Sequence, residues 1–143
     1  MKADAKTVAA VRDLLEEYAG ALSRGDLDTV MAMFAKEPGL VHIGTGADEW
    51  CEGCGELREQ FWRVVEQSEG LRLQFANLHV SQAGRVCWLS SNAKVSAKVT
   101  GQDRTYDVRA TAVLEKRGDN WYFVQTHFSL PADQETGKSF PNG

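Results

Sequence analysis

Two cysteines separated by two residues form a Cys-x-x-Cys pair, an arrangement that can bind a metal ion or carry redox chemistry. Cys51 and Cys54 flank a Glu-Gly dipeptide, and the third cysteine, Cys87, lies far along the chain. A tetrahedral zinc site needs four ligands, and no neighbouring His or Cys supplies the other two. A thioredoxin-like site requires a strand–helix–strand setting, which is absent here. We therefore expect no metal and no cofactor, and interpret the pair as residues of a loop at a pocket mouth.

A His-x-Ser motif near the C-terminus is the second arrangement that suggests chemistry. His127 and Ser129 occupy alternate positions of a predicted strand. Such positions share a face but lie about 7 Å apart at the backbone. A Ser–His nucleophile also requires a hydrogen bond between the two groups and an orienting acid. We expect these residues to connect strands rather than to catalyse a reaction.

Four tryptophans are many for 143 residues. Trp121 begins the last predicted strand and is expected to fill the core or an interface. Trp50 and Trp88 are candidates for the lining of a binding pocket, because aromatic walls suit a flat or hydrophobic ligand. Core packing explains three of the four equally well.

The N-terminal half reads as helices. Apolar residues recur at helical spacing over residues 4–24, and Gly25 ends this stripe. Asp26 is placed to cap a second helix over residues 27–34. A short strand is expected at residues 40–43, before a third helix over residues 55–67.

The second half reads as a β-meander. Four strand-like segments are expected over residues 71–82, 85–99, 104–117 and 121–130, with short turns between them. Helices followed by an antiparallel meander predict an α+β fold rather than an alternating one. We expect one domain over residues 4–131 and a flexible tail over residues 132–143.

The strand over residues 85–99 carries apolar residues on both faces. One parity includes Cys87 and Leu89, and the other includes Val86 and Trp88. A sheet that is apolar on both faces must be covered on both. Since three helices cover one face, the other is predicted to form a homodimer interface.

Charge and hydropathy exclude two classes of partner. The net charge is −4 and there is no run of Lys or Arg, so nucleic acid is not an expected partner. No stretch approaches the length of a membrane span, and no segment resembles a signal peptide. A cytoplasmic protein is the expectation.

Two motifs resemble known families. Residues 18–34, YAGALSRGDLDTVMAMF, resemble the helix-Gly-Asp-helix opening of the ketosteroid isomerase and SnoaL-like families. Residues 118–129, GDNWYFVQTHFS, resemble the final strand of SnoaL-like domains and are similar to the association domain of calmodulin-dependent kinase II. The resemblance implies the cone of the nuclear-transport-factor-2-like (NTF2-like, or cystatin-like) fold. Three N-terminal helices would pack there on a strongly curved, mainly antiparallel sheet.

The resemblance also implies roles for single residues. Tyr18 falls where ketosteroid isomerases have a tyrosine that donates to the developing oxyanion. His42 stands where they have the general-base aspartate, while Phe61 and Ala112 replace two further polar groups. Ketosteroid isomerisation itself is therefore not expected. Tyr18 and His42 are the catalytic candidates, because a neutral imidazole facing a phenol can transfer protons near neutral pH.

The remaining pocket candidates follow from strand parity and from the same resemblance. Trp88 and Ser90 are assigned to the face of Ala112, Leu114 and Phe128, which gives the predicted lining as Trp50, Phe61, Trp88, Ser90, Ala112, Leu114 and Phe128.

Two functions remain open at this stage. The first is binding of a small, largely apolar or aromatic molecule, with acid–base chemistry of an isomerase, dehydratase or cyclase. The second is a non-enzymatic oligomerisation or ligand-sensing module similar to the kinase association domain.

Overall fold

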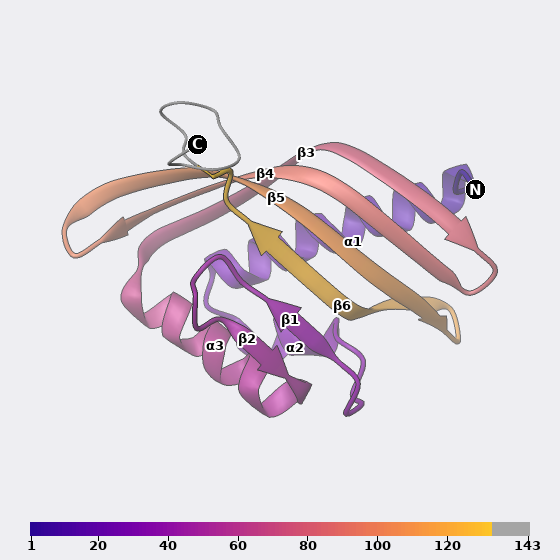
Figure 1. Cartoon of the computed structure of the whole chain (residues 1–143), viewed down its shortest axis with the longest axis horizontal. Coiled ribbons are helices and arrows are strands. Elements are labelled where there is room, and N and C mark those ends of the chain that lie inside the picture. Colours follow the sequence, from indigo (N-terminus) through magenta and orange to yellow (C-terminus); the bar gives the residue numbers. More distant parts are fainter. Residues whose placement is uncertain (133–143) are drawn as a thin grey trace.

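Three helices precede most of the sheet in the computed structural model, which describes residues 1–132 (Figure 1). They are α1 (Ala5–Ser23), α2 (Leu27–Ala32) and α3 (Gly53–Gln67). The predicted helices agree with these to within two residues at every end. The predicted tail, apart from Ala132, lies outside the described residues.

Side-chain caps fix where the first two helices begin. The Asp4 carboxylate accepts a hydrogen bond from the Thr7 amide at 2.7 Å, and Asp26 accepts one from the Thr29 amide at 3.1 Å. Both bonds satisfy amides that the first turn of a helix leaves free. Between the helices, Gly25 has a φ of +71°, a conformation that glycine adopts without steric cost.

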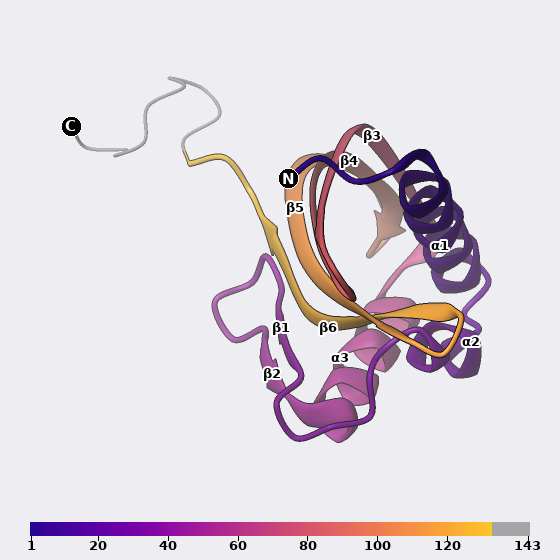
Figure 2. The ribbon, with the colours of Figure 1, turned by 90° about the vertical axis from the view of Figure 1, so that its right-hand side faces the viewer.

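Six strands form one sheet in the order β2-β1-β6-β5-β4-β3. Their bounds are β1 (Val41–Ile43), β2 (Trp50–Glu52), β3 (Glu69–Ala83), β4 (Val86–Val99), β5 (Gln102–Arg117) and β6 (Asn120–Ser129). β1 runs parallel to β6, and the other pairings are antiparallel. Figure 2 shows the sheet curving around the side on which the helices lie. The predicted α+β, mainly antiparallel fold is confirmed, and β2 is the strand that the sequence did not predict.

Two irregularities bend the sheet. Asn77 has a φ of +57° where the register of β3 shifts against β4. On β6, Val124 is an extra, unpaired residue: Gln125 and Phe123 pair with the consecutive β5 residues Val113 and Leu114. An extra residue of this kind increases local bending and twist. Phe123 and Thr126 are consequently both buried although their positions differ by three.

An aromatic cluster forms the centre of the core. Tyr18 is surrounded by Phe34, Phe61, Phe75 and Phe123, with ring centroids 6.0–6.4 Å away. Tilted and edge-on contacts at this separation are the favoured arrangement of aromatic pairs. The cluster ties α1, α3 and the segment that follows α2 to the concave face of the sheet, and so fixes the floor of the site.

The outer face of the sheet is more polar than the sequence pattern predicted. Partly buried apolar side chains there include Trp88 and Val113, which pair across β4 and β5. Most outward residues around them are polar: Arg72, Gln74, His79, Ser90, Asn92, Lys94, Arg109, Thr111, Gln125 and His127. The expectation of two apolar faces was wrong, because the outward positions of β4 that follow Trp88 are the polar residues Ser90 and Asn92.

Within residues 1–132, no helix combines the length and apolar character that a membrane crossing requires.

Candidate functional site

A cavity of about 510 Å³ lies between the concave face of the sheet, α3 and the loop joining β1 to β2. Its walls are mainly apolar: Leu22, Phe61, Val64, Leu71, Leu73, Val95, Ala97, Val99, Val108, Phe128 and Leu130. Polar residues line it as well, and Tyr18 and His42 are among them. An apolar cavity of several hundred Å³ with a few polar groups is typical of small-molecule sites.

Tyr18 reaches the cavity from α1. Its position on the buried stripe of this helix leaves the side chain only 4% exposed. Burial raises the pKa of the Tyr18 hydroxyl well above its ordinary value, because the phenolate loses its hydration. The hydroxyl therefore stays protonated at physiological pH and can donate a hydrogen bond.

His42 reaches the cavity from β1. Its Nδ1 lies 2.7 Å from the hydroxyl oxygen of Thr126, on the neighbouring strand β6. Its ring packs against Phe61 and Phe128, with centroid distances of 5.4 and 6.0 Å. Burial, together with a smaller contribution from the nearby charge of His127, lowers the pKa of His42 to about 4. The imidazole is therefore neutral at physiological pH.

The reactive atoms of both residues face open space. Within residues 1–132, every side-chain nitrogen or oxygen that is sealed from solvent has a hydrogen-bond partner. Neither the Tyr18 hydroxyl nor His42 Nε2 has such a partner among these residues. Both residues line the same cavity, which is the space next to these two atoms.

Several polar residues of the site were not predicted from the sequence, among them Gln60, Glu49 and Thr126. Gln60 lines the cavity and accepts a hydrogen bond from Arg63 at 3.0 Å, which leaves its amide nitrogen available. Glu49 lines it from the β1–β2 loop. Thr126 holds His42. A polar residue on the buried stripe of α3 is the signal that marks Gln60, whereas nothing in the sequence places Glu49 or Thr126.

The Glu49 carboxylate is held by a glycine turn. It accepts a hydrogen bond from the Gly46 amide at 2.7 Å. A Cβ on Gly44 would lie 2.9 Å from the Cβ of Glu49, closer than such atoms approach. The turn between β1 and β2 thus needs glycine at position 44 to seat this carboxylate at the cavity rim.

Four of the predicted lining residues lie on the concave side, in two different places. Phe61 and Phe128 line the cavity. Ala112 and Leu114 also point inward from β5, but they lie in the buried core outside the cavity lining. The sequence predicted correctly that Ala112 and Leu114 share a face with Phe128. It did not predict that they lie too far along β5 to line the cavity.

The assignment of Trp88 and Ser90 to the cavity is wrong. Directly paired residues of antiparallel strands share a face, and Ala112 pairs with Leu89 whereas Trp88 pairs with Val113. Trp88 and Ser90 therefore point outward, where they line a separate hollow of about 450 Å³. His127 also lies on this outer face, opposite Thr111.

The assignment of Trp50 to the cavity is also wrong. Trp50 lies on the edge strand β2 and is 58% exposed. Its indole nitrogen donates a hydrogen bond to the Glu52 carboxylate at 3.1 Å. Side chains alternate along β2, so Trp50 points outward and Cys51 inward. This strand was not predicted from the sequence, and the alternation therefore could not be predicted either.

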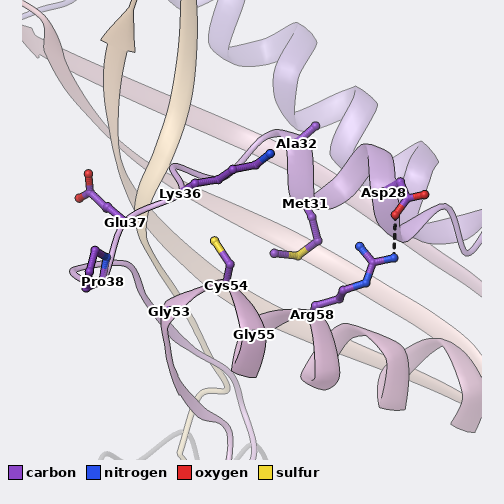
Figure 3. Close-up of a pocket in the computed structure, with 10 residues that line it drawn as sticks. All are labelled: Asp28, Met31, Ala32, Lys36, Glu37, Pro38, Gly53, Cys54, Gly55 and Arg58. Carbon is purple, nitrogen blue, oxygen red and sulfur yellow. Dashed lines mark hydrogen bonds and ion pairs between the residues drawn. The ribbon is translucent and has the colours of Figure 1, made fainter.

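The two close cysteines face different surroundings. Cys51 is buried beside His42 across the β1–β2 pairing, and burial raises the pKa of its thiol, with a further contribution from Glu56. Cys54 lies in a hollow of about 750 Å³ between α2 and α3 (Figure 3). Its thiol donates to the Ala35 carbonyl at 3.6 Å. Across residues 1–132, no three His, Cys, Asp or Glu side chains are grouped to hold a metal ion.

Solved structures with this fold come from several bacteria. A proposed dehydratase of the NTF2-like family from Streptomyces avermitilis matches with a TM-score of 0.79 and 19% identity, covering 87% of this chain and 96% of that one. An NTF2-like superfamily protein from Salmonella enterica gives 0.80 and 17%, covering 91% and 94%. A proposed calcium/calmodulin-dependent protein kinase II association domain from Xanthomonas campestris gives 0.76 and 19%, covering 92% and 91%.

At these identities the likeness establishes the fold and not the activity. No curated protein matches the chain. The family model described as the SnoaL-like domain matches residues 11–133, which is most of the sequence. The chain therefore belongs to the SnoaL-like domain family.

Proposed function

We propose that the chain binds a small, largely apolar or aromatic carbonyl compound in the cavity and transfers a proton at the carbon next to the carbonyl group. The observation that carries this proposal is the pair Tyr18 and His42, which line the same cavity and whose hydroxyl and Nε2 have no hydrogen-bond partner within residues 1–132. Such chemistry belongs to cofactor-independent isomerases, dehydratases and cyclases.

Tyr18 is proposed to stabilise the enolate. The hydroxyl donates to the carbonyl oxygen, on which negative charge develops when the neighbouring carbon loses its proton. A donor in an apolar, water-poor site stabilises such charge more than water does. The raised pKa of Tyr18 supports this role, because the group keeps its proton until the oxyanion forms.

His42 is proposed to take the proton. When the ring carries its own proton on Nδ1, that N–H donates to Thr126 and leaves the lone pair of Nε2 directed at the cavity. The C–H electron pair then passes into the enolate, and the proton bonds to Nε2. Return of the proton to another carbon completes an isomerisation. Transfer of the proton from Nε2 to a departing β-hydroxyl group, which leaves as water while the enolate electrons form the C=C bond, completes a dehydration.

Assembly or ligand sensing without turnover is the second candidate function. The Xanthomonas campestris structure named as a kinase association domain shares the fold and motivates this candidate. An assembly module has no need of a cavity, and its interior is better filled by side chains. The open volume of about 510 Å³ favours the small-molecule function.

Homodimerisation and a cytoplasmic location are part of the same proposal. The outward pair Trp88 and Val113, with the hollow beside them, is the apolar centre of the proposed dimer interface. A polar rim around an apolar centre is the usual anatomy of such an interface.

The test uses 2-tetralone, an aromatic ketone with acidic α-hydrogens, in deuterated buffer. We expect the protein to accelerate exchange of these hydrogens, followed by proton NMR. His42→Ala should remove the acceleration, since a positioned general base typically contributes about 10²–10⁴-fold. Tyr18→Phe should reduce it by about 10²-fold or more, as loss of an oxyanion donor does.

Trp62→Ala is the matched control, because Trp62 is 54% exposed on α3 and does not line the cavity. Exchange at the buffer rate with the wild-type protein, or at the wild-type rate with His42→Ala, would overturn the proposed proton transfer.

A further inference from the structure

Arg104 is a charged residue at an inward position of β5. Inward positions alternate along this strand, and between Arg104 and Leu114 the others are Tyr106, Val108, Ala110 and Ala112. The inward positions of the adjacent strand β4 are uncharged. Residues 101–107 are all exposed, so Arg104 lines the cavity at its solvent-exposed end.

The guanidinium of Arg104 has no carboxylate partner within residues 1–132. Its side-chain hydrogen bond is to a neutral group, since one terminal nitrogen donates to the Gln102 side-chain oxygen at 3.0 Å. By contrast, Arg58, Arg63 and Arg117 each form an ion pair with a carboxylate. Arg104 therefore keeps donor N–H groups available to a molecule in the cavity, because guanidinium carries five of them.

Glu49 is the other charged side chain that lines the cavity. One of its oxygens is already bonded to the Gly46 amide, and it lies on the β1–β2 loop rather than on β5. Glu49 and Arg104 are not within ion-pair distance of each other. The positive charge on β5 is therefore not neutralised inside the cavity.

We infer that Arg104 binds an anionic group of the ligand, so that the cavity takes an amphipathic anion with an apolar or aromatic body and a carboxylate at the mouth. Guanidinium matches the planar carboxylate with two parallel hydrogen bonds. The apolar walls take the body of the same molecule, with its reacting end toward Tyr18 and His42. This inference rests on the proposed small-molecule site and names the class of ligand for it.

The test compares 2-naphthoate with 2-naphthamide, a neutral analogue of nearly the same shape, by isothermal titration calorimetry. We expect the wild-type protein to bind the carboxylate about tenfold more tightly than the amide, as charge-assisted hydrogen bonds permit. Arg104→Gln should remove this preference and leave the affinity for the amide unchanged. Raising the salt concentration should weaken only the binding of the carboxylate.

Arg72→Gln is the matched control. Arg72 lies on the outer face of β3, where it pairs with Ser96 of β4. The substitution removes one positive charge there, and the variant should still bind the carboxylate about tenfold more tightly than the amide. Equal affinities of the two probes for the wild-type protein, or equal losses in both variants, would overturn the role of Arg104. If neither probe binds, or if neither shifts the NMR signals of His42, the small-molecule site itself fails, and the inference fails with it.

Discussion

His42 and Thr126 meet across the parallel pairing of β1 with β6, with Nδ1 2.7 Å from the threonine hydroxyl oxygen. Both side chains are buried. The contact occupies the ring nitrogen that faces the sheet, so the other nitrogen is directed at the cavity. A threonine of the last strand thereby orients a histidine that lies 84 positions earlier in the sequence.

Thr126→Val should weaken the action of His42 as a base, because it removes the hydroxyl that orients the imidazole ring. The variant keeps the shape of the side chain but deletes the hydroxyl, so the free energy of unfolding should fall by about 1–2 kcal/mol. Proton exchange in 2-tetralone should slow by about tenfold, because His42 loses its fixed tautomer and orientation. Thr126→Ser, which restores the hydroxyl, should recover most of the rate. The ¹⁵N shifts of the His42 ring report the tautomer, and unchanged shifts in Thr126→Val would contradict the positioning role.

Stability should depend on pH through His42. Its pKa is lowered to about 4 in the folded protein, against about 6.5 in the unfolded chain. As the pH falls below about 6.5, the unfolded state takes up a proton that the folded state does not, so the folded state loses stability until about pH 4. The total loss from this group is about 3 kcal/mol. Urea unfolding across this range measures it, with His42→Gln as the reference in which this part of the pH dependence disappears. Parallel pH profiles for the two proteins would show that the pKa of His42 is not lowered.

The glycine turn beside Glu49 gives a double-mutant test. Gly44→Ala should lower the free energy of unfolding by about 1–3 kcal/mol, because the new methyl group meets the Glu49 side chain. The same substitution should cost much less in a Glu49→Ala background, where the colliding atoms are gone. Additive effects of the two substitutions would mean that the turn does not hold the carboxylate.

A dimer through the outer face of the sheet should be sensitive to Trp88. We expect sedimentation velocity to give a dimer at micromolar concentration, and Trp88→Lys to give a folded monomer, since a charge at the centre of an apolar patch opposes association. Trp62→Lys is the control, because Trp62 is exposed on α3. A wild-type monomer at micromolar concentration would defeat the prediction.

Cys51 and Cys54 should hold no structural metal. The first is buried in the core and the second faces the hollow between α2 and α3. Elemental analysis should find far less than one zinc per chain, and a chelator should not lower the melting temperature. Stoichiometric zinc, or unfolding upon chelation, would refute this.

The sequence predicted the long elements because their apolar periodicity is strong, and it missed β2 because three residues carry no measurable period. That omission also misplaced Trp50. The face on which Trp88 lies follows from the register between β4 and β5, and a single sequence does not reveal that register. The positions of Tyr18 and His42 were expected from a family resemblance, whereas Glu49 and Thr126 needed the folded loop and the strand pairing.

A crystal structure of the protein soaked with 2-tetralone would show whether Tyr18 and His42 bind a ketone together. We expect the ketone inside the cavity, its oxygen about 2.6–3.2 Å from the Tyr18 hydroxyl and its α-carbon facing His42 Nε2. A cavity filled by its own side chains, or a ketone whose oxygen contacts neither residue, would contradict this expectation.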